Sequence, residues 1–358
     1  MSFLHTEAMT PTALTAHGEE LHLLLSIPDD SLIPHERQAL AYLHFDGQTW
    51  THRTTLHNNG LFLRTSVLAD DKGGADLFWA GDPPEALPPS PTDDISLLNE
   101  WTTLFHCKWE GNECKKTPPL FSSKRNRWWM RESVRDDEGN AHLVFLYNAF
   151  IYHLILRGEQ AEMQRALLGL YPRLQYHDKA LFLAYVDTPQ PPRHGANDLY
   201  YRSYRNGTWS DPVLVYHDPE RTAHVPTIAI DLNGVHHLAW MVLPGDGEVL
   251  LFHATSNNEG LTWSEPEQVF SIRTMFARAP MMAVDGDNTV HLVWGHWHTP
   301  PEAFIFYASY RDGKWSEPEE PFKEIPITSP PYMALDALDR IHVVWVGEKA
   351  VYHSMSLP

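Results

Sequence analysis

The sequence predicts an all-β fold, a single seven-bladed β-propeller that spans residues 1–358. One motif occurs seven times at a mean spacing of about 53 residues, and such self-similarity is typical of repeat architectures. Short β-rich runs bounded by Gly, Asn, Asp and Pro lie between the copies. Helical periodicity is confined to "EQAEMQRALL" at 159–168, for which we expect a short helix. Repeats with about four short strands each are typical of propeller blades.

The repeat consists of an acidic turn, a histidine, an aliphatic residue, any residue and a large apolar residue. The clearest copies are "DDEGNAHLVFL" (136–146), "DLNGVHHLAWM" (231–241), "DGDNTVHLVWG" (285–295) and "DALDRIHVVWV" (336–346). Weaker copies complete the set of seven. The residues at the histidine position, here called the repeat anchors, are His22, Asp76, His142, Phe182, His237, His291 and His342.

A tryptophan follows several anchors by 24 to 28 residues. These residues are Trp50, Trp209, Trp263 and Trp315, and Trp109 is a looser match. Only 16 residues follow His342, which is too few to complete a four-stranded blade. We therefore expect the N-terminal "MSFLHTE" to supply the missing outer strand and close the ring, which removes exposed sheet edges.

Composition and charge narrow the range of functions. A hydrophobic fraction of 43%, with 13 Trp, 14 Tyr and 15 Phe, supports a packed core. The formal charge of −19 argues against nucleic acid or an anionic membrane as a partner, because both attract cationic surfaces. With neither a signal peptide nor an apolar run of spanning length, the chain is predicted to be cytoplasmic, or secreted and already processed. The sequence leaves the oligomeric state open.

Two cysteines, Cys107 and Cys114, flank "KWEGNE". They are spaced to close a hairpin by a disulfide, but one pair does not make a disulfide framework. Reduced thiols are slightly favoured over a disulfide.

The stretch "SNNEGLTW" at 256–263 carries a family resemblance. Ser256, Asn258, Gly260, Thr262 and Trp263 resemble the Ser-x-Asp-x-Gly-x-Thr-Trp turn called the Asp-box, with Asn258 where Asp is usual. With the periodicity, the chain is similar to BNR/Asp-box-repeat propellers, which include six-bladed sialidases and seven-bladed carbohydrate-active families such as ulvan lyases and a rhamnosidase family. The resemblance implies a seven-bladed ring and a carbohydrate ligand, and it points to architecture more specifically than to activity.

Propeller topology indicates which face to search. If strands A to D run outward from the axis, the acidic A–B turns and the Asp-box C–D turn share one face. The D–A and B–C connections emerge on the opposite face, where propellers place their ligands. A Pro-rich acidic insertion at about 81–100 in blade 2 is placed either to lean over the channel as a lid or to hang outside it.

Arginines and aromatic residues gather in the connections of that ligand face although the chain is acidic. Arginine suits carboxylate or sulfate oxygens, and aromatic rings stack on sugars. Arg278-Ala279-Pro280 resembles the Arg-Ile-Pro of sialidases, in which the Arg binds the substrate carboxylate. The remaining sialidase residues have no counterparts that we can align, so a sialidase proper is not predicted. The predicted substrate-binding residues are Arg127, Arg173, Arg193, Arg278, Trp128, Trp297 and Tyr332.

The predicted catalytic residues are His224, His296, His298, Tyr147 and Glu302. His296 and His298 form a His-x-His, which places both rings on one side of an extended segment. Two ligands do not specify a metal, so no cofactor is predicted, and a metal ion is left open. The five anchor histidines recur in register, so we expect them to be structural, with a buried ring nitrogen bonded to a neighbouring strand's backbone. The acidic turns are expected to bond their own backbone.

These observations predict a propeller that recognises an anionic glycan of uronic or sialic type, as a glycoside hydrolase or a polysaccharide lyase. A hydrolase needs two flanking carboxylates, and Asp187, Glu248, Glu302 and Glu348 lie in suitable connections. A lyase needs a cation for the uronate carboxylate and a His or Tyr to remove the α-proton. Two alternatives are a non-catalytic lectin or protein-interaction scaffold, and an intracellular enzyme that acts on a small molecule.

Overall fold

The computed structural model describes residues 2–3, 10–28, 38–60, 64–81, 101–111, 113–124, 129–147, 150–187, 197–243, 247–273, 276–277, 279–297, 303–323, 327, 329, 331–347 and 350–356. The predicted insertion at 81–100 lies outside these residues except for Gly81.

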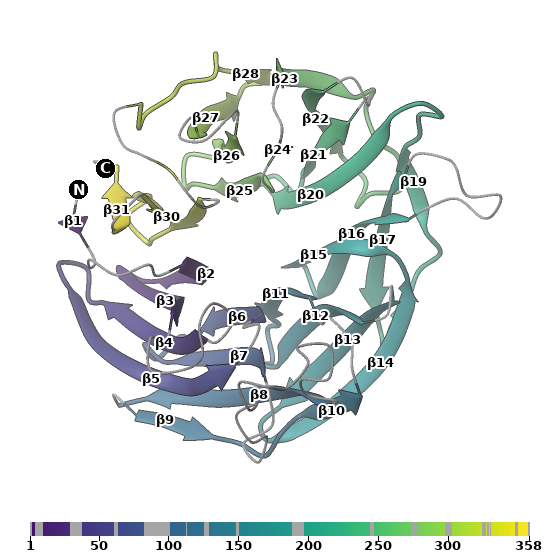
Figure 1. Ribbon diagram of the computed structural model, residues 1–358. Coiled ribbons are helices and arrows are strands. Elements are labelled where there is room, and N and C mark those ends of the chain that lie inside the picture. Colours follow the sequence, from purple (N-terminus) through teal and green to yellow (C-terminus); the bar gives the residue numbers. More distant parts are fainter. Residues whose placement is uncertain are drawn as a thin grey trace, which may run out of the picture.

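Seven antiparallel sheets of four or five strands stand in a ring around a central axis (Figure 1). The chain is therefore a seven-bladed β-propeller, as predicted. Within the described ranges no helix is both long and apolar enough to cross a membrane.

Blades 1 to 3 come from the N-terminal part of the chain. Blade 1 contains β2 (Thr10–His17), β3 (Glu20–Pro28), β4 (Gln38–Phe45) and β5 (Trp50–Gly60). Blade 2 contains β6 (Arg64–Ala69), β7 (Ala75–Gly81), β8 (Trp101–Glu110), β9 (Glu113–Lys116) and β10 (Phe121–Lys124). Blade 3 contains β11 (Trp129–Arg135), β12 (Ala141–Tyr147), β13 (Phe150–Arg157) and β14 (Gln160–Leu168).

Blades 4 to 7 follow in order. Blade 4 contains β15 (Leu170–His177), β16 (Ala180–Asp187), β17 (Asp198–Arg205), β18 (Thr208–Trp209) and β19 (Val213–Tyr216). Blade 5 contains β20 (Thr222–Ile230), β21 (His236–Leu243), β22 (Glu248–Ser256) and β23 (Glu267–Arg273). Blade 6 contains β24 (Phe276–Ala277), β25 (Met281–Val284), β26 (Val290–Trp297), β27 (Ala303–Arg311) and β28 (Lys314–Trp315). Blade 7 contains β29 (Tyr332–Leu335), β30 (Ile341–Val346), β31 (Val351–Met355) and β1 (Ser2–Phe3).

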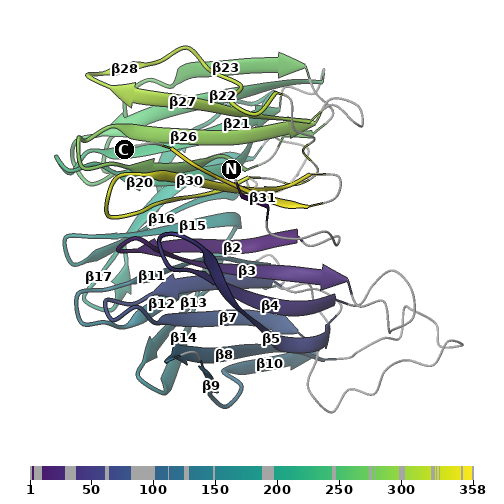
Figure 2. The ribbon, with the colours of Figure 1, turned by 90° about the vertical axis from the view of Figure 1, so that its left-hand side faces the viewer.

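The two ends of the chain meet in blade 7. Ser2 pairs with His353 and Phe3 with Tyr352, so β1 becomes the outer strand beside β31. Figure 1 and Figure 2 both show the N-terminal strand next to the last one. The predicted ring closure is confirmed.

The core is divided among the interfaces between blades. Seven apolar clusters of buried residues each join one blade to the next, for example Leu23 and Leu43 of blade 1 with Val344 of blade 7. Because each of these clusters spans the interface between two blades, burial of apolar side chains stabilises the closed ring as well as each sheet.

The acidic turns bond their own backbone, as predicted. In blade 3, one carboxylate oxygen of Asp136 accepts hydrogen bonds from the N–H groups of Glu138 (3.0 Å) and Asn140 (2.8 Å). Its other oxygen lies 3.0 Å from Nε2 of the anchor His142. Asp231, Asp285 and Asp336 make the same kinds of backbone bond. One side chain thus fixes the turn and orients the anchor histidine.

The anchor histidines are buried, but their partners are side chains and not the expected strand backbone. Nδ1 of His142 lies 2.9 Å from Nε2 of His153 on the next strand, and His342 is related to His353 in the same way at 2.9 Å. The corresponding distance between His237 and His253 is 3.1 Å. In blades 1 and 6 a tyrosine hydroxyl, of Tyr42 or Tyr307, replaces the second histidine.

The repeated tryptophans join neighbouring blades. Each packs on the strand-C histidine or tyrosine of the preceding blade, at ring-centroid distances of 4.3 to 5.5 Å. The pairs are Trp50 with His353, Trp109 with Tyr42, Trp209 with His153, Trp263 with Tyr201 and Trp315 with His253. The Trp50 indole donates to His353 Nδ1 over 3.3 Å and 303 positions of sequence, so this contact also closes the ring.

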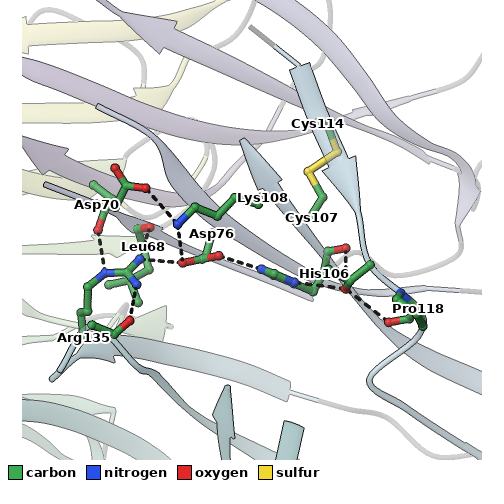
Figure 3. A network of polar contacts seen from close by, with 12 residues as sticks. Leu68, Asp70, Asp76, His106, Cys107, Lys108, Cys114, Pro118 and Arg135 are labelled. Carbon is green, nitrogen blue, oxygen red and sulfur yellow. Dashed lines mark hydrogen bonds and ion pairs between the residues drawn. A yellow bond between two sulfur atoms is a disulfide. The ribbon is translucent and has the colours of Figure 1, made fainter. Parts of the chain in front are cut away.

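Blade 2 has Asp76 at the anchor position, and basic side chains surround it (Figure 3). His106 Nε2 lies 2.8 Å from one carboxylate oxygen, and Arg135 of blade 3 donates to the other at 2.6 Å. Lys108 lies 3.0 Å from Asp70 and 3.8 Å from Asp76. These contacts hold the pKa of Asp76 below its usual value despite its burial. A buried carboxylate is stable here because it is paired.

The "SNNEGLTW" turn lies between β22 and β23, as predicted for a C–D hairpin. Asn258 accepts from Ser256 Oγ (2.9 Å) and from the Thr262 N–H (2.9 Å), so the amide oxygen fills the place of the usual carboxylate. Gly260 has φ +83°, and an added Cβ there would lie 2.2 Å from the Tyr201 ring. The turn is a structural element.

Two further expectations are wrong. Residues 160–168 form the outer strand β14 and not a helix, because pairing with β13 satisfies their backbone. Cys107 and Cys114 form a disulfide that links β8 to β9, so the preference for reduced thiols is also wrong.

Candidate functional site

Several predicted site residues lie outside the described part of the chain. His224, Tyr147, Arg173 and Tyr332 are described with their side chains. His296 and Trp297 are placed in β26, where only their backbone is described. Outside the described residues lie His298, Glu302, Arg127, Arg193, Arg278 and Trp128. The roles given to all twelve stay predictions.

The innermost strands bring the described candidates to the axis. Arg173 pairs with Ala184 and Tyr332 with Val344, in each case two positions beyond the repeat anchor on strand B. The residues at this level of the ring are Ala13, Ser66, Glu132, Arg173, Thr227, Met281 and Tyr332. Arg173 and His224 were expected in connections, but they lie within β15 and β20.

The side chain of Arg173 links four blades. Its Nε donates to the carbonyl oxygen of Pro226 in blade 5 at 2.9 Å. Nη1 lies 3.4 Å from Glu132 Oε1 of blade 3, and Nη2 lies 3.5 Å from the carbonyl oxygen of Pro280, between β24 and β25 of blade 6. The side chain is buried, with 8% of its surface exposed. Three guanidinium nitrogens already contact protein oxygens, so the described contacts show Arg173 as a joint across the axis.

Glu132 completes this joint and was not predicted from the sequence. Its second oxygen accepts a hydrogen bond from the Leu174 N–H at 3.1 Å. The repeat contained a signal for it: Thr227, Met281 and Tyr332 each stand ten residues before their anchors, and Glu132 stands ten residues before His142. Counting back from the anchors would have placed a carboxylate at the axis beside Arg173.

Tyr171 and His224 form an aromatic pair between blades 4 and 5. Their ring centroids are 4.3 Å apart and the rings are inclined at 54°. Both residues lie where the register of the innermost strand shifts, between Leu170 and Arg173 and between His224 and Thr227. Such bulges re-aim side chains and are frequent near functional sites.

The backbone is strained at these bulges. Tyr171 has φ 53° and Val225, next to His224, has φ 39°. Left-handed φ values are costly for a β-branched residue such as valine and cluster at functional sites. The strain marks the entry of strands β15 and β20 as the part of the described structure to test first.

A second polar group lies in blade 4, at one end of the pair of strands β16 and β17. Asp187 and Asp198 face each other in the last pair of β16 and β17. His217 Nδ1 lies 2.8 Å from Asp198, and the Tyr200 hydroxyl donates to Asp198 at 3.4 Å. Burial, together with these two carboxylates, raises the pKa of Tyr200. Asp198, His217 and Tyr200 were not predicted.

A search of the described residues for three metal-donating side chains gives one group, Glu20, His22 and His44. It belongs to strands β3 and β4 of blade 1. It includes the blade 1 anchor His22 and is separate from the groups around Arg173, His224 and Asp198.

Comparisons with known proteins give structural neighbours alone. No protein-family model matches the chain. No curated protein sequence matches it. Each neighbour described below is at most 13% identical to this chain, and at that identity the similarity shows the fold.

Solved structures match over nearly the full length. An ulvan lyase of polysaccharide lyase family PL25, bound to -[GlcA(1-4)Rha3S]-, is similar with a TM-score of 0.63 and 12% identity, over 99% of this chain and 97% of that one. A protein of unknown function from Dyadobacter fermentans has a TM-score of 0.57 and 13% identity, over 99% and 96%. An α-L-arabinanase from Penicillium chrysogenum has a TM-score of 0.50 and 12% identity, over 99% and 98%.

Proposed function

We propose that this chain is a carbohydrate-active propeller that cleaves an anionic polysaccharide by β-elimination, at the ligand face around the axis. The observation that carries the proposal is the Tyr171–His224 pair on strained backbone next to Arg173. The carbohydrate-active fold neighbours support it, including a lyase bound to a glucuronate-containing ligand.

The chemistry follows from what β-elimination requires. A base removes the proton next to the uronate carboxylate, a cation stabilises the charge that develops on that carboxylate, and an acid protonates the leaving oxygen. An adjacent histidine and tyrosine supply one base and one acid. Arg173 supplies positive potential at the axis, while Glu132 and two carbonyl oxygens hold its position.

The test is turnover of a panel of uronate polysaccharides, including ulvan, alginate and polygalacturonate. The unsaturated product absorbs in the ultraviolet, whereas hydrolysis yields reducing ends without that absorbance. We expect absorbance from the wild type, loss of at least about 100-fold in His224→Ala, the lower end of what proton-transfer residues contribute, and a smaller loss in Tyr171→Phe. His177→Ala, at the opposite end of β15, is the matched control and should turn over as wild type does.

Two outcomes would reject the elimination mechanism. Wild-type turnover by the His224→Ala variant would remove the histidine from the reaction. Reducing ends without ultraviolet absorbance would indicate a glycoside hydrolase, and Asp198→Asn would then be the variant to test because Asp187 and Asp198 are paired. Binding of a polysaccharide without turnover would favour a lectin.

A further inference from the structure

Blade 1 departs from the repeat at its anchor histidine. In blades 3, 6 and 7 the anchor Nε2 lies 2.9 to 3.0 Å from the aspartate six residues earlier. In blade 1 that earlier position is Ala16, and a two-residue turn, Gly18 and Glu19, joins the strands. His22 is fully buried, and its Nε2 has no hydrogen-bond partner among the described residues.

Two other donors lie beside His22 where the aspartate is missing. Glu20 stands two residues before it on β3, and therefore on the same side of the strand. His44 faces His22 across β3 and β4, with ring centroids 5.2 Å apart. Glu20 Oε2 and His44 Nε2 are 3.3 Å apart. One donor atom from each of the three residues lies within 4.8 Å of the others.

We infer that Glu20, His22 and His44 form a binding site for Zn²⁺. Two imidazoles and one carboxylate are zinc ligands. Zinc lies about 2.0–2.2 Å from such a donor atom, so the three donor atoms have to move toward the metal, and toward one another, by about 1 Å. His22 Nδ1 lies 2.6 Å from the Tyr42 hydroxyl, so Nε2 is the nitrogen left to bind metal. Metal-binding histidines commonly donate their other ring N–H to such a partner, which fixes the tautomer.

The described residues supply three donors, which leaves the fourth position of a tetrahedral site to water or an exogenous ligand. Glu20 also lines a hollow of about 470 Å³, together with His17, Glu19, Asp46 and Lys72. The carboxylates of Glu19 and Asp46 favour a cation, and Lys72 opposes it. Three protein ligands with one open position are typical of zinc sites that bind water or an exogenous ligand. The site concerns a different blade and different residues from the proposed lyase centre.

The first experiment titrates the full chain, freed of metal by a chelator, with zinc chloride at neutral pH in a calorimeter. We expect one Zn²⁺ per chain, and at least about tenfold weaker binding in His44→Gln and in Glu20→Gln, since loss of even a second-shell partner costs about 10–100-fold. His217→Gln is the matched control, because it removes an imidazole 2.8 Å from a carboxylate in blade 4. It should bind zinc as wild type does.

The second experiment replaces zinc by Co²⁺ and follows its visible absorption. Intense bands of four-coordinate Co²⁺, shifted when imidazole is added, are expected in the wild type and absent in His44→Gln. Absence of zinc binding at micromolar concentrations, or equal binding by wild type and both site variants, would overturn the site. Cobalt bands unaffected by imidazole would overturn the open position. Neither variant alters the buried His22, so both are expected to fold.

Discussion

Acid should unfold this propeller through the buried histidine pairs. In blades 3, 5 and 7 the strand-C residues His153, His253 and His353 are at most 3% exposed. Burial, with smaller contributions from neighbouring charges, lowers the pKa of each of these imidazoles to about 3. In blades 3 and 7 the strand-C histidine's Nε2 lies 2.9 Å from Nδ1 of the anchor histidine, whose own Nε2 lies 3.0 Å from an aspartate. In blade 5 the histidine pair is 3.1 Å apart, and the anchor Nε2 is 3.6 Å from Asp231. The ring nitrogen that accepts in each pair must lack a proton, which keeps that ring neutral.

The sign and size of the effect follow from linkage. The folded pKa of about 3 lies below the unfolded value of about 6.5, so the unfolded chain binds more protons between these values and stability falls as pH falls. At pH 5 each histidine costs about 2 kcal/mol relative to pH 8, or about 6 kcal/mol for the three. This is comparable to a total stability of about 5–15 kcal/mol.

The chain itself supplies a suitable substitution. Blades 1 and 6 have Tyr42 and Tyr307 at the same register, and each hydroxyl lies within hydrogen-bond distance of the anchor histidine. His253→Tyr should therefore keep a partner for His237 and remove one titrating group. The free energy of unfolding is measured in urea between pH 5 and 8. Near pH 5, we expect its slope against pH to fall by about 1.4 kcal/mol per pH unit for each histidine replaced.

The control for this experiment is Leu154→Ala, a truncation of a buried residue next to His153. It should lower the free energy of unfolding by about 2–5 kcal/mol at every pH, which displaces the curve without changing its slope. If the variant that combines His153→Tyr, His253→Tyr and His353→Tyr kept the wild-type dependence on pH, the buried pairs would not be the acid-sensitive element.

Three further predictions concern the ring and its axis. Deleting residues 1–9 removes β1 and exposes the β31 edge, so the melting temperature should fall, by about 2–4 °C per kcal/mol lost, and self-association should rise; unchanged melting would contradict the closure. Gly260→Ala should cost about 2–4 kcal/mol in urea unfolding, because its methyl group would overlap Tyr201 at φ +83°, and a neutral result would reject that contact. Arg173→Met should cost about 3 kcal/mol, measured in the same way, because it removes the cation beside the Glu132 carboxylate, and Glu132→Gln combined with it should recover part of the loss if the two act as a pair.

The architecture was predictable because the period of the repeat indicates it. The anchors fall on strand B in all seven blades, and the interval to each tryptophan reflects the length of chain from strand B to the contact with the preceding blade. Ring closure followed from a count of the residues left after His342. Each of these inferences needs chain distances and strand alternation, which the sequence contains directly.

The wrong or missing inferences depend on contacts between strands of one blade or between blades. The backbone partners expected for the anchor histidines are in fact side chains such as Asp136 and His153, whose proximity depends on strand register. The helical pattern at 159–168 yielded to pairing with β13. Glu132 contacts Arg173 only when blades 3 and 4 pack together. The sequence prediction placed each arginine in its own loop and therefore gave Arg173 no partner from another blade.

The pairing of β1 with β31 orders events during synthesis. Ser2 leaves the ribosome some 350 residues before its partner His353, so at about 5–20 residues per second it waits tens of seconds for a place in the sheet. Trp50 likewise waits for His353. Six blades are complete in sequence before the last interface exists, and the nascent chain is therefore an open arc whose two end surfaces need protection until β31 has been synthesised.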